Sequence, residues 1–361
     1  MSKLGQYVNI KTGKLDANAS SDNGKYPFFT CAVEPLKIDT YSYDCECVLV
    51  AGNGDLNVKY YKGKFDAYQR TYIIESKNKS VLYVPYIYYF LDKYVETLRK
   101  QAIGGVIKYI KLGNLTGANI PVPDLSKQQE VVSNLDKVSH TIDLCKAILE
   151  KLDLFVKARF VEMFGDENEF EKWNCCIVED IADVTVGVVI KPTQYYAENG
   201  IPAFRSLNIG ELFIKDRDWV YFTKEGHQKN QKSKVRENDV LVVRSGAPGT
   251  ACVVTKKYDG YNAVDIIIAH PDNTKVNSVF LATFTNMPHG MQQIKNRIGG
   301  AAQQHFNVSG YKAMKLILPP LDLQIQFADF VGQVDKSKQK VSETLEKAET
   351  LKKKLMQDYF G

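Results

Sequence analysis

A segment of 45 residues occurs twice in this chain, and this repeat limits the possible folds more than any other feature. The first copy is residues 121–165 and the second is residues 317–361. Residues that match across the copies, each 196 positions apart, are Pro123 with Pro319, Leu125 with Leu321, Gln128 with Gln324, and Gly165 with Gly361. A gapless repeat of this length indicates an internally duplicated architecture.

Within each copy, apolar residues recur in alternating steps of four and three after a proline-marked start. A period of 3.5 residues held over several heptads indicates a coiled-coil seam rather than the apolar face of a globular helix. The first seam consists of Val131, Leu135, Val138, Ile142, Cys145, Leu149, Leu152 and Val156, and the second of Phe327, Val331, Val334, Val341, Leu345 and Ala348. Lys338 interrupts the second seam where the first has Ile142, and a polar residue of this kind costs stability while fixing register.

A helix from Ser126 to Met163 would be roughly 55 Å long at a rise of 1.5 Å per residue. Its seam could be buried by oligomerisation or by packing of the two helices within one chain, and the gapless duplication favours the second arrangement. We therefore predict an α+β chain with two mixed, β-rich lobes separated by two long helices. The helices form an antiparallel intramolecular coiled coil, and a pseudo-two-fold relates the halves. The segments are residues 1–120 (lobe 1), 121–165 (first helix), 166–317 (lobe 2) and 318–361 (second helix).

The two lobes share a looser plan of strands and turns. Matching segments are YPFF (26–29) with IPAF (201–204), CVLVAGNG (47–54) with DVLVVRSG (239–246), FDAY (65–68) with YNAV (261–264), and GGVIKYI (104–110) with GGAAQQHF (299–306). The offset grows from 174 to 196, so lobe 2 has about 22 extra residues, which we expect in loops. A shared scaffold with divergent loops indicates two binding lobes with different targets. The alternative is that the copies diverged without acquiring separate tasks.

Charge and cysteine content indicate the class of partner and the cellular compartment of the chain. The net charge is +5, and residues 1–120 alone carry five more basic than acidic residues, which gives mild support for a polyanionic partner. The seven cysteines form no CxxC pair, and reduced thiols in the cytoplasm are the favoured interpretation. The N-terminus lacks an apolar signal region. The most apolar run, residues 81–91, is too short and too rich in tyrosine to cross a membrane.

The motif search predicts a chain with no catalytic residues, no metal site and no cofactor of its own. The chain has neither a GxxxxGKS nor a GxxxxGKT loop, and GxSxG and HExxH are absent too. The five histidines have no partner at ligand spacing. A nuclease with an unrecognised site is the alternative, and it predicts metal-dependent cutting by the isolated chain.

Candidate nucleic-acid contacts lie at turns that recur in both lobes. The glycines of RSGAPG (244–249), and more weakly those of GNGD (52–55), let backbone approach a phosphate closely. Glutamine and arginine side chains suit the edges of bases. The candidates are Lys11, Lys14, Gln69, Arg70 and Lys108 in lobe 1, and Lys191, Arg205, Asn208, Arg244, Ser245, Gln303, Gln304 and His305 in lobe 2. For any one of them a solvated loop residue is an equal alternative, and only the recurrence favours binding.

The segments PVPDLSKQQEVV and LPPLDLQIQF, each opening a long helix after a variable lobe, resemble the specificity subunits of type I restriction–modification systems. The GGVIKYI and GGAAQQHF turns and the closing MFG and YFG extend the resemblance over essentially the whole chain, although DLQIQ departs from the pattern that SKQQ fits. The resemblance implies that each lobe is a target-recognition domain for one half of a bipartite double-stranded DNA site. It also implies that the helices set the gap and dock two methyltransferase subunits.

Restriction (translocase) subunits would join that core. S-adenosylmethionine and ATP would belong to the partners, and no membrane is involved. A competing interpretation is a duplicated scaffold whose lobes bind protein and whose helices mediate oligomerisation. Salt discriminates between the two, because counterion release makes DNA affinity fall steeply with ionic strength.

Overall fold

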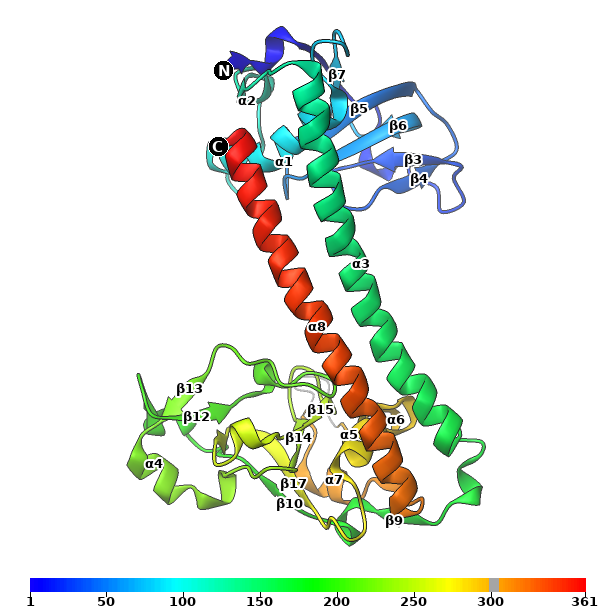
Figure 1. The fold of residues 1–361 in the computed structure, drawn as a ribbon, viewed down its shortest axis with the longest axis vertical. Coiled ribbons are helices and arrows are strands. Elements are labelled where there is room, and N and C mark those ends of the chain that lie inside the picture. The colour runs from blue at the N-terminus through cyan, green and yellow to red at the C-terminus, as the bar shows by residue number, and fades with distance from the viewer. Residues whose placement is uncertain (299–304) are drawn as a thin grey trace. The chain divides into compact units, whose positions relative to one another are not determined.

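The computed structural model describes residues 1–298 and 305–361, which divide into two compact units. Unit 1 comprises Met1–Ala147 with Ser342–Gly361, and unit 2 comprises Ile148–Val341. Two 40-residue helices, α3 (Leu125–Phe164) and α8 (Leu321–Phe360), each contribute to both units (Figure 1). None of the helices in the described ranges is long and apolar enough to span a bilayer.

Unit 1 is built on a six-stranded sheet with the order β2-β7-β5-β6-β3-β4. The strands are β2 (Val8–Thr12), β7 (Thr71–Ser76), β5 (Tyr43–Ala51), β6 (Val58–Ala67), β3 (Tyr26–Phe29) and β4 (Leu36–Ile38). Strands β3 and β6 run parallel, and the other neighbours run antiparallel. Helix α1 (Val84–Gln101) buries Ile87, Phe90 and Leu91 in the core of the unit, which also contains Val48 and Val50 of β5.

Unit 2 repeats this topology as two four-stranded sheets. The first has the order β10-β17-β14-β15, from β10 (Ala182–Val186), β17 (Ile266–Pro271), β14 (Val240–Val243) and β15 (Ala251–Val253). The second has the order β11-β13-β12-β16, from β11 (Tyr196–Ala197), β13 (Val220–Phe222), β12 (Ile201–Phe204) and β16 (Asn262–Ala263). The first sheet matches β2-β7-β5-β6 of unit 1 strand for strand.

The register of one parallel strand pair shows that the duplication extends to individual residues. Phe29 pairs with Ala67 in unit 1, and Phe204 pairs with Ala263 in unit 2. These are the residues that the alignments of YPFF with IPAF and of FDAY with YNAV predict to be equivalent. The two β-rich lobes therefore share a scaffold, as predicted.

The remaining elements follow in the same order in both units. In unit 1 these are β1 (Ser2–Lys3) paired with β8 (Asn119–Ile120), then α1 and α2 (Leu112–Thr116). In unit 2 they are β9 (Cys175–Ile177) paired with β18 (Lys315–Ile317), then α5 (Ser278–Asn286), α6 (Pro288–Arg297) and α7 (Val308–Lys312).

The extra residues of lobe 2 do not all form loops, so that prediction is only half right. Residues 39–42 join β4 to β5 in unit 1, whereas residues 223–239 join β13 to β14 in unit 2. This longer link folds into helix α4 (Lys224–Lys229), whose N-cap Thr223 accepts a hydrogen bond from the Gly226 amide. A capping threonine supplies one of the bonds that a short helix needs at its start.

The long helices run antiparallel in both units. In unit 1 the amide of Asn134 donates to the hydroxyl of Tyr359 (3.2 Å). In unit 2 the Lys338 ammonium lies 2.6 Å from the Asp153 carboxylate. Unit 1 has a second pair, Lys146 and Glu349 (3.8 Å), and unit 2 has the Phe160 and Phe327 rings, with centroids 5.4 Å apart. Within each unit, residue numbers on α8 therefore fall as those on α3 rise. Every seam residue predicted from the sequence is buried or half-buried. Lys338, the polar residue in the second seam, is neutralised by its ion pair with Asp153.

The last aromatic residue of each long helix anchors that helix in a lobe. Phe164 packs against Phe280 in unit 2, with ring centroids 5.0 Å apart. Phe360 packs against Tyr86 in unit 1, with ring centroids 5.1 Å apart. The repeated Phe-Gly ending therefore marks the end of a helix that is buried against a core, where aromatic pairs add to the burial of apolar area.

Candidate nucleic-acid interface

Four loops of unit 1 meet at the edge of the sheet where β2 and β5 end and β7 begins. The Gly13 amide donates to the Thr71 carbonyl (3.0 Å), and the Gly52 amide donates to the Arg70 carbonyl (2.8 Å). The Gly54 amide donates to the Lys108 carbonyl (3.0 Å). These backbone bonds bring Lys14, Gln69, Arg70 and Lys108, which are far apart in the sequence, to one edge.

Some side chains at this edge form ion pairs or hydrogen bonds within the lobe, and others form no ion pair. Lys14, Arg70 and Lys108 are exposed, and none forms an ion pair with another described residue. The Gln69 amide donates to Asp16 Oδ1 (2.8 Å). Lys11 is different, because its ammonium lies 3.0 Å from Glu75, and this contact raises the pKa of Lys11. The edge therefore presents three uncompensated cations.

Two apolar residues that were not among the predicted contacts lie in the loop that carries Lys108. The backbones of Ile103 and Tyr109 exchange hydrogen bonds of 3.0 and 2.8 Å, which close residues 104–108 into a tight turn. Gly104 has φ +119°, which favours glycine. Val106 is fully exposed and Ile107 is 62% exposed at the tip of the turn. The available signal was an apolar pair that follows two glycines.

At the equivalent edge of unit 2, the structure corrects the expectation for Arg244. Its side chain is only 14% exposed and forms an ion pair with Asp265, and its Nε donates to the Phe306 carbonyl (3.2 Å). By strand pairing, Asp265 holds the position that Arg70 holds in unit 1, and Arg244 aligns with Gly52. Unit 2 therefore has an Arg244–Asp265 ion pair where unit 1 has Arg70 without a counter-ion. The Arg244 guanidinium is thus engaged within the unit by the Asp265 carboxylate and the Phe306 carbonyl.

Ser245 and His305 complete this cluster without forming a catalytic arrangement. The Ser245 hydroxyl lies 3.4 Å from Asp265 Oδ2 and 3.4 Å from His305 Nδ1. A nucleophile needs a base that is itself oriented by a third group, and here the carboxylate is held by Arg244 instead of by the histidine. Among residues 1–298 and 305–361, no group of three His, Cys, Asp or Glu side chains could hold a metal ion.

Asn208 requires a second correction. Its side chain is fully buried, accepts a hydrogen bond from the Arg205 amide (2.8 Å) and donates one to the Arg217 carbonyl (2.7 Å). It therefore shapes the turn after β12 and cannot reach a base. Arg205 is half-buried and donates to the Asp218 carbonyl (2.6 Å). Lys191 is exposed, and the last two candidates, Gln303 and Gln304, lie outside the described residues.

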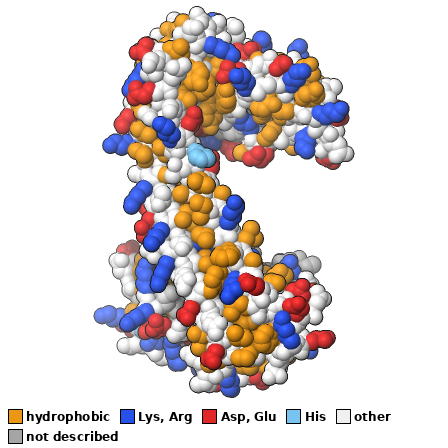
Figure 2. Space-filling view, turned by 45° about the vertical axis from the view of Figure 1, so that its right-hand side comes forward, with side chains coloured by type: hydrophobic (Ala, Val, Ile, Leu, Met, Phe, Trp, Pro, Cys, Tyr) orange, Lys and Arg blue, Asp and Glu red, His pale blue; other side chains and the backbone are white. Residues whose placement is uncertain are grey.

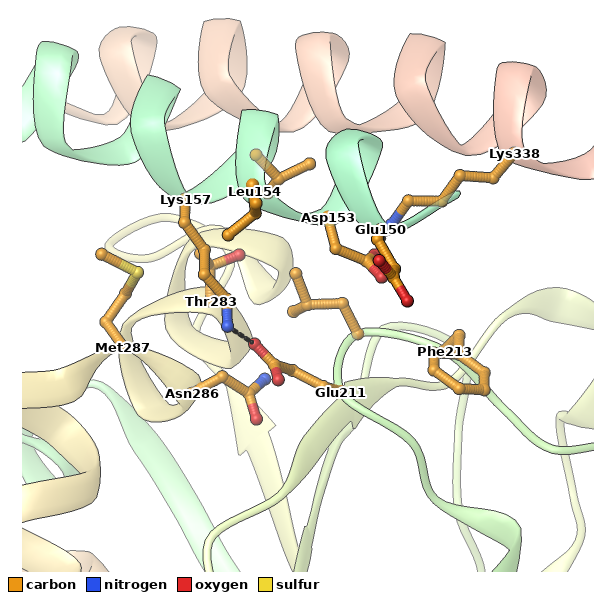
Figure 3. A pocket seen from close by; sticks show the side chains of 12 residues that line it. Glu150, Asp153, Leu154, Lys157, Glu211, Phe213, Thr283, Asn286, Met287 and Lys338 are labelled. Atoms are coloured by element: carbon orange, nitrogen blue, oxygen red, sulfur yellow. Dashed lines mark ion pairs between the residues drawn. The ribbon is translucent and has the colours of Figure 1, made fainter. Parts of the chain in front are cut away.

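A pocket of about 410 Å³ lies within unit 2 beneath α3 (Figure 3). Leu154, Val156 and Met287 supply apolar walls. Two ion pairs belong to its lining: Lys157 lies 2.7 Å from Glu211, and Lys338 lies 2.6 Å from Asp153. Because the cations already have carboxylate partners, the pocket has the chemistry of a packing surface and offers no activated nucleophile.

Surface charge alone does not mark an interface. Basic and acidic side chains are interspersed on the face shown in Figure 2, and apolar side chains gather along the helices. Phe155 on α3 is 53% exposed and Leu351 on α8 is 47% exposed, and they are equivalent residues of the 196-residue repeat. Each follows an exposed Glu-Lys pair, Glu150–Lys151 in the first copy and Glu346–Lys347 in the second. The duplicated helices thus share one exposed apolar position that is preceded by a Glu-Lys pair.

Sequence comparison places this duplicated architecture among known proteins. The family described as "Type I restriction modification DNA specificity domain" matches residues 1–154 and 171–349, which cover both lobes. The chain belongs to this specificity-domain family. The alternative of an unrelated scaffold is not favoured by these findings.

Relatives within the family are similar over different lengths. The EcoDI specificity subunit of Escherichia coli is 37% identical over 155 residues, which are 43% of this chain and 34% of that subunit. A putative specificity subunit of Haemophilus influenzae is 22% identical over 338 residues, covering 90% of this chain and 83% of the relative. The chain therefore matches about a third of the EcoDI subunit and 58% of the EcoBI specificity subunit of Escherichia coli, which is 21% identical.

Two solved structures share the fold. The chain described as the type I restriction-modification system S subunit from M. genitalium has a TM-score of 0.66 at 15% identity, over 100% of this chain and 95% of that one. A chain from a study of complex assembly and conformational transition of the type I R-M system has a TM-score of 0.55 at 14% identity, over 99% and 96%.

Proposed function

We propose that this chain is the non-catalytic DNA-recognition subunit of a type I restriction–modification complex. Residues 1–120 and 166–317 are the two target-recognition domains, and residues 121–165 and 318–361 are the spacer and docking helices. Each domain reads one half of a bipartite duplex site, and the helices set the gap between the halves. The observation that carries the proposal is the repetition of one lobe topology, down to the Phe29–Ala67 and Phe204–Ala263 registers, in a member of the specificity family.

In unit 1 the contacts would come from the edge that gathers Lys14, Gln69, Arg70 and Lys108. Lysine without a counter-ion neutralises phosphate, whereas arginine and glutamine can bond to the edges of guanine and adenine in the major groove. Lys11 contributes less, because its charge is already compensated by Glu75. The exposed Val106 and Ile107 lie on the same loop as Lys108 and provide apolar contact area of the type that suits thymine methyl groups.

Two methyltransferase subunits would dock on the helices, one at each of two equivalent positions of the repeat. Phe155 and Leu351 supply equivalent exposed apolar anchors, and the neighbouring Glu-Lys pairs supply a polar rim. Aromatic and aliphatic anchors within a polar rim are typical of protein interfaces. Restriction subunits would join this core. S-adenosylmethionine and ATP would be bound by the partners, and the assembly would act in the cytoplasm on chromosomal or invading DNA.

A map of adenine methylation in the host, with and without this gene, tests the proposal. We expect deletion to remove one split motif, two short half-sites around a fixed gap. Binding of the assembled complex to a duplex that carries the motif should also weaken steeply with salt, because each neutralised phosphate releases a counter-ion. A scaffold without DNA-binding activity would leave every methylated motif in place and would show no such salt dependence.

A further inference from the structure

Unit 2 contains a groove of about 660 Å³ that has no counterpart in the short β4–β5 link of unit 1. One wall is the loop after β10, residues 186–190, together with Gln194 and Tyr195. The other wall is residues 229–233, at the end of α4 and in the turn that follows it. This second wall belongs to the link of residues 223–239, which is longer than the matching link in unit 1.

Strand β16 fixes both walls. Asn262 is fully buried; its Oδ1 lies 2.7 Å from His227 Nδ1, and its Nδ2 donates to Ser233 Oγ (2.8 Å). The next residue holds the opposite wall, because the Ala263 carbonyl accepts a hydrogen bond from the Val188 amide (2.8 Å). Two adjacent residues of one strand thus position two loops, so the width of the groove is set by the core of the lobe.

The chemistry of the groove suits a polyanion. Lys229 and Lys232 are exposed on one wall, and no residue that lines the groove is acidic. Neither lysine forms an ion pair within the described part of the chain, and the same holds for Lys191, which follows the groove residue Ile190. The exposed amide of Gln194 also belongs to the lining, whereas Gln231 Nε2 already donates to the His227 and Gln228 carbonyls (3.2 and 3.0 Å). Arg244 of the same unit, in contrast, is neutralised by Asp265.

We propose that this groove is the phosphate-backbone contact of the second target-recognition domain. Lys229 and Lys232 neutralise two phosphates of the half-site, and the amide of Gln194 donates a hydrogen bond to the same strand. The inference rests on the proposed DNA-binding function and assigns the contact of unit 2 to these groove residues instead of to Arg244 and Asn208. Phosphate contacts position a protein on the duplex and carry no sequence information directly. The groove therefore contributes affinity, not base preference.

The test uses the Lys229→Gln/Lys232→Gln double variant in the assembled methyltransferase complex, with a duplex carrying the methylated motif. We expect at least a tenfold loss of affinity at 150 mM salt, and the slope of log K against log salt should become shallower by about 1.8, since each phosphate contributes about 0.9. The Lys229→Arg/Lys232→Arg variant should retain the wild-type slope. Thermal unfolding should be unchanged, because both side chains are exposed and unpaired.

The matched control is Lys224→Gln/Lys256→Gln, which removes two exposed lysines of the same unit that do not line the groove. A groove variant that behaves like this control would overturn the assignment, while wild-type binding would still support the proposed function. A change in the methylated motif at one half-site would also overturn it, because the groove would then read bases. If wild-type complex shows no salt-dependent binding to the motif, the proposed function itself fails.

Discussion

The buried amides of Gln128 and Gln324, 196 residues apart, make the same hydrogen bonds in the two units. Each Oε1 accepts from the backbone amide of the N-cap residue of a lobe helix, and each Nε2 donates to the carbonyl of the proline five residues earlier. For Gln128 the partners are Tyr83 (2.9 Å) and Pro123 (2.8 Å), and for Gln324 they are Asn277 (2.9 Å) and Pro319 (2.8 Å). The repeated glutamine thus joins the start of each long helix to the lobe that precedes it.

Replacing Gln128 or Gln324 by alanine should lower the free energy of unfolding by about 2–4 kcal/mol. Each change leaves a buried amide and a buried carbonyl without a partner, and each such group costs about 1–3 kcal/mol. Urea denaturation followed by circular dichroism measures the effect. Gln333→Ala, at an exposed position of α8, is the control and should change stability by less than about 0.5 kcal/mol. A Gln128 variant as stable as this control would contradict the structural role.

Shortening both long helices by one heptad should change the gap between the half-sites and leave the half-sites themselves intact. Deleting residues 138–144 and 334–340 removes equivalent segments and keeps the seam in phase, and it shortens each helix by roughly 10 Å. This length corresponds to about three base pairs, since B-DNA rises 3.4 Å per pair. Methylation mapping reads out the new gap. An unchanged gap in a complex that still methylates DNA would falsify the spacer role.

Arg70→Ala should weaken binding to the motif by about 1–3 kcal/mol and relax base preference at one position of the half-site read by unit 1. The guanidinium is exposed and has no counter-ion, and a bidentate contact to guanine is worth about that much. Competition binding with single-base variants of the site measures both effects. Lys11→Ala is the matched control in the same lobe, and we expect a smaller loss because Glu75 already compensates that charge.

Arg244→Ala should act through stability instead of through DNA contact. The change leaves the Asp265 carboxylate without its cation, and we expect a loss of about 1–3 kcal/mol in the free energy of unfolding. The Arg244→Ala/Asp265→Ala double variant should regain part of that loss, which would show that the two side chains act as a pair. An Arg244 variant with native stability and selectively reduced DNA affinity would restore the direct contact predicted from the sequence.

Asp92→Asn should raise the thermal midpoint by a few degrees at pH 7 and have little effect at pH 4. Burial raises the pKa of Asp92 on α1, and Lys352 on α8 offsets the rise only in part. The folded state therefore binds the proton more tightly than the unfolded state, so the carboxyl opposes folding as pH rises above its ordinary range. Scanning calorimetry from pH 4 to pH 7 measures the difference. A variant that is less stable than wild type at pH 7 would contradict this sign.

The sequence by itself determined the duplication, the two long helices and their seam, because these features depend on local periodicity. Residues from Val131 to Val156 repeat every 3.5 positions on a single helix, so no distant contact is needed to predict that they share a face. The equivalence of Phe29 with Phe204 and of Ala67 with Ala263 was also visible, since each lies in a short strand with a matching neighbourhood. The joint role of Gln128 and Gln324 was not visible, although their repetition was.

Only the tertiary structure decided which polar side chains remain open to a partner. Whether Arg70 or Arg244 has a counter-ion depends on the residue across the sheet, and strand pairing places Asp265 beside Arg244 from 21 positions away. Asn208 has a side-chain amide of the type that can bond to bases, yet the turn buries it, and the amide bonds to the backbone of Arg205 and Arg217. The groove between residues 186–190 and 229–233 exists because Asn262 and Ala263 hold two separate loops. Contacts of this kind depend on pairing between segments that are distant in the chain, so no local sequence pattern predicts them.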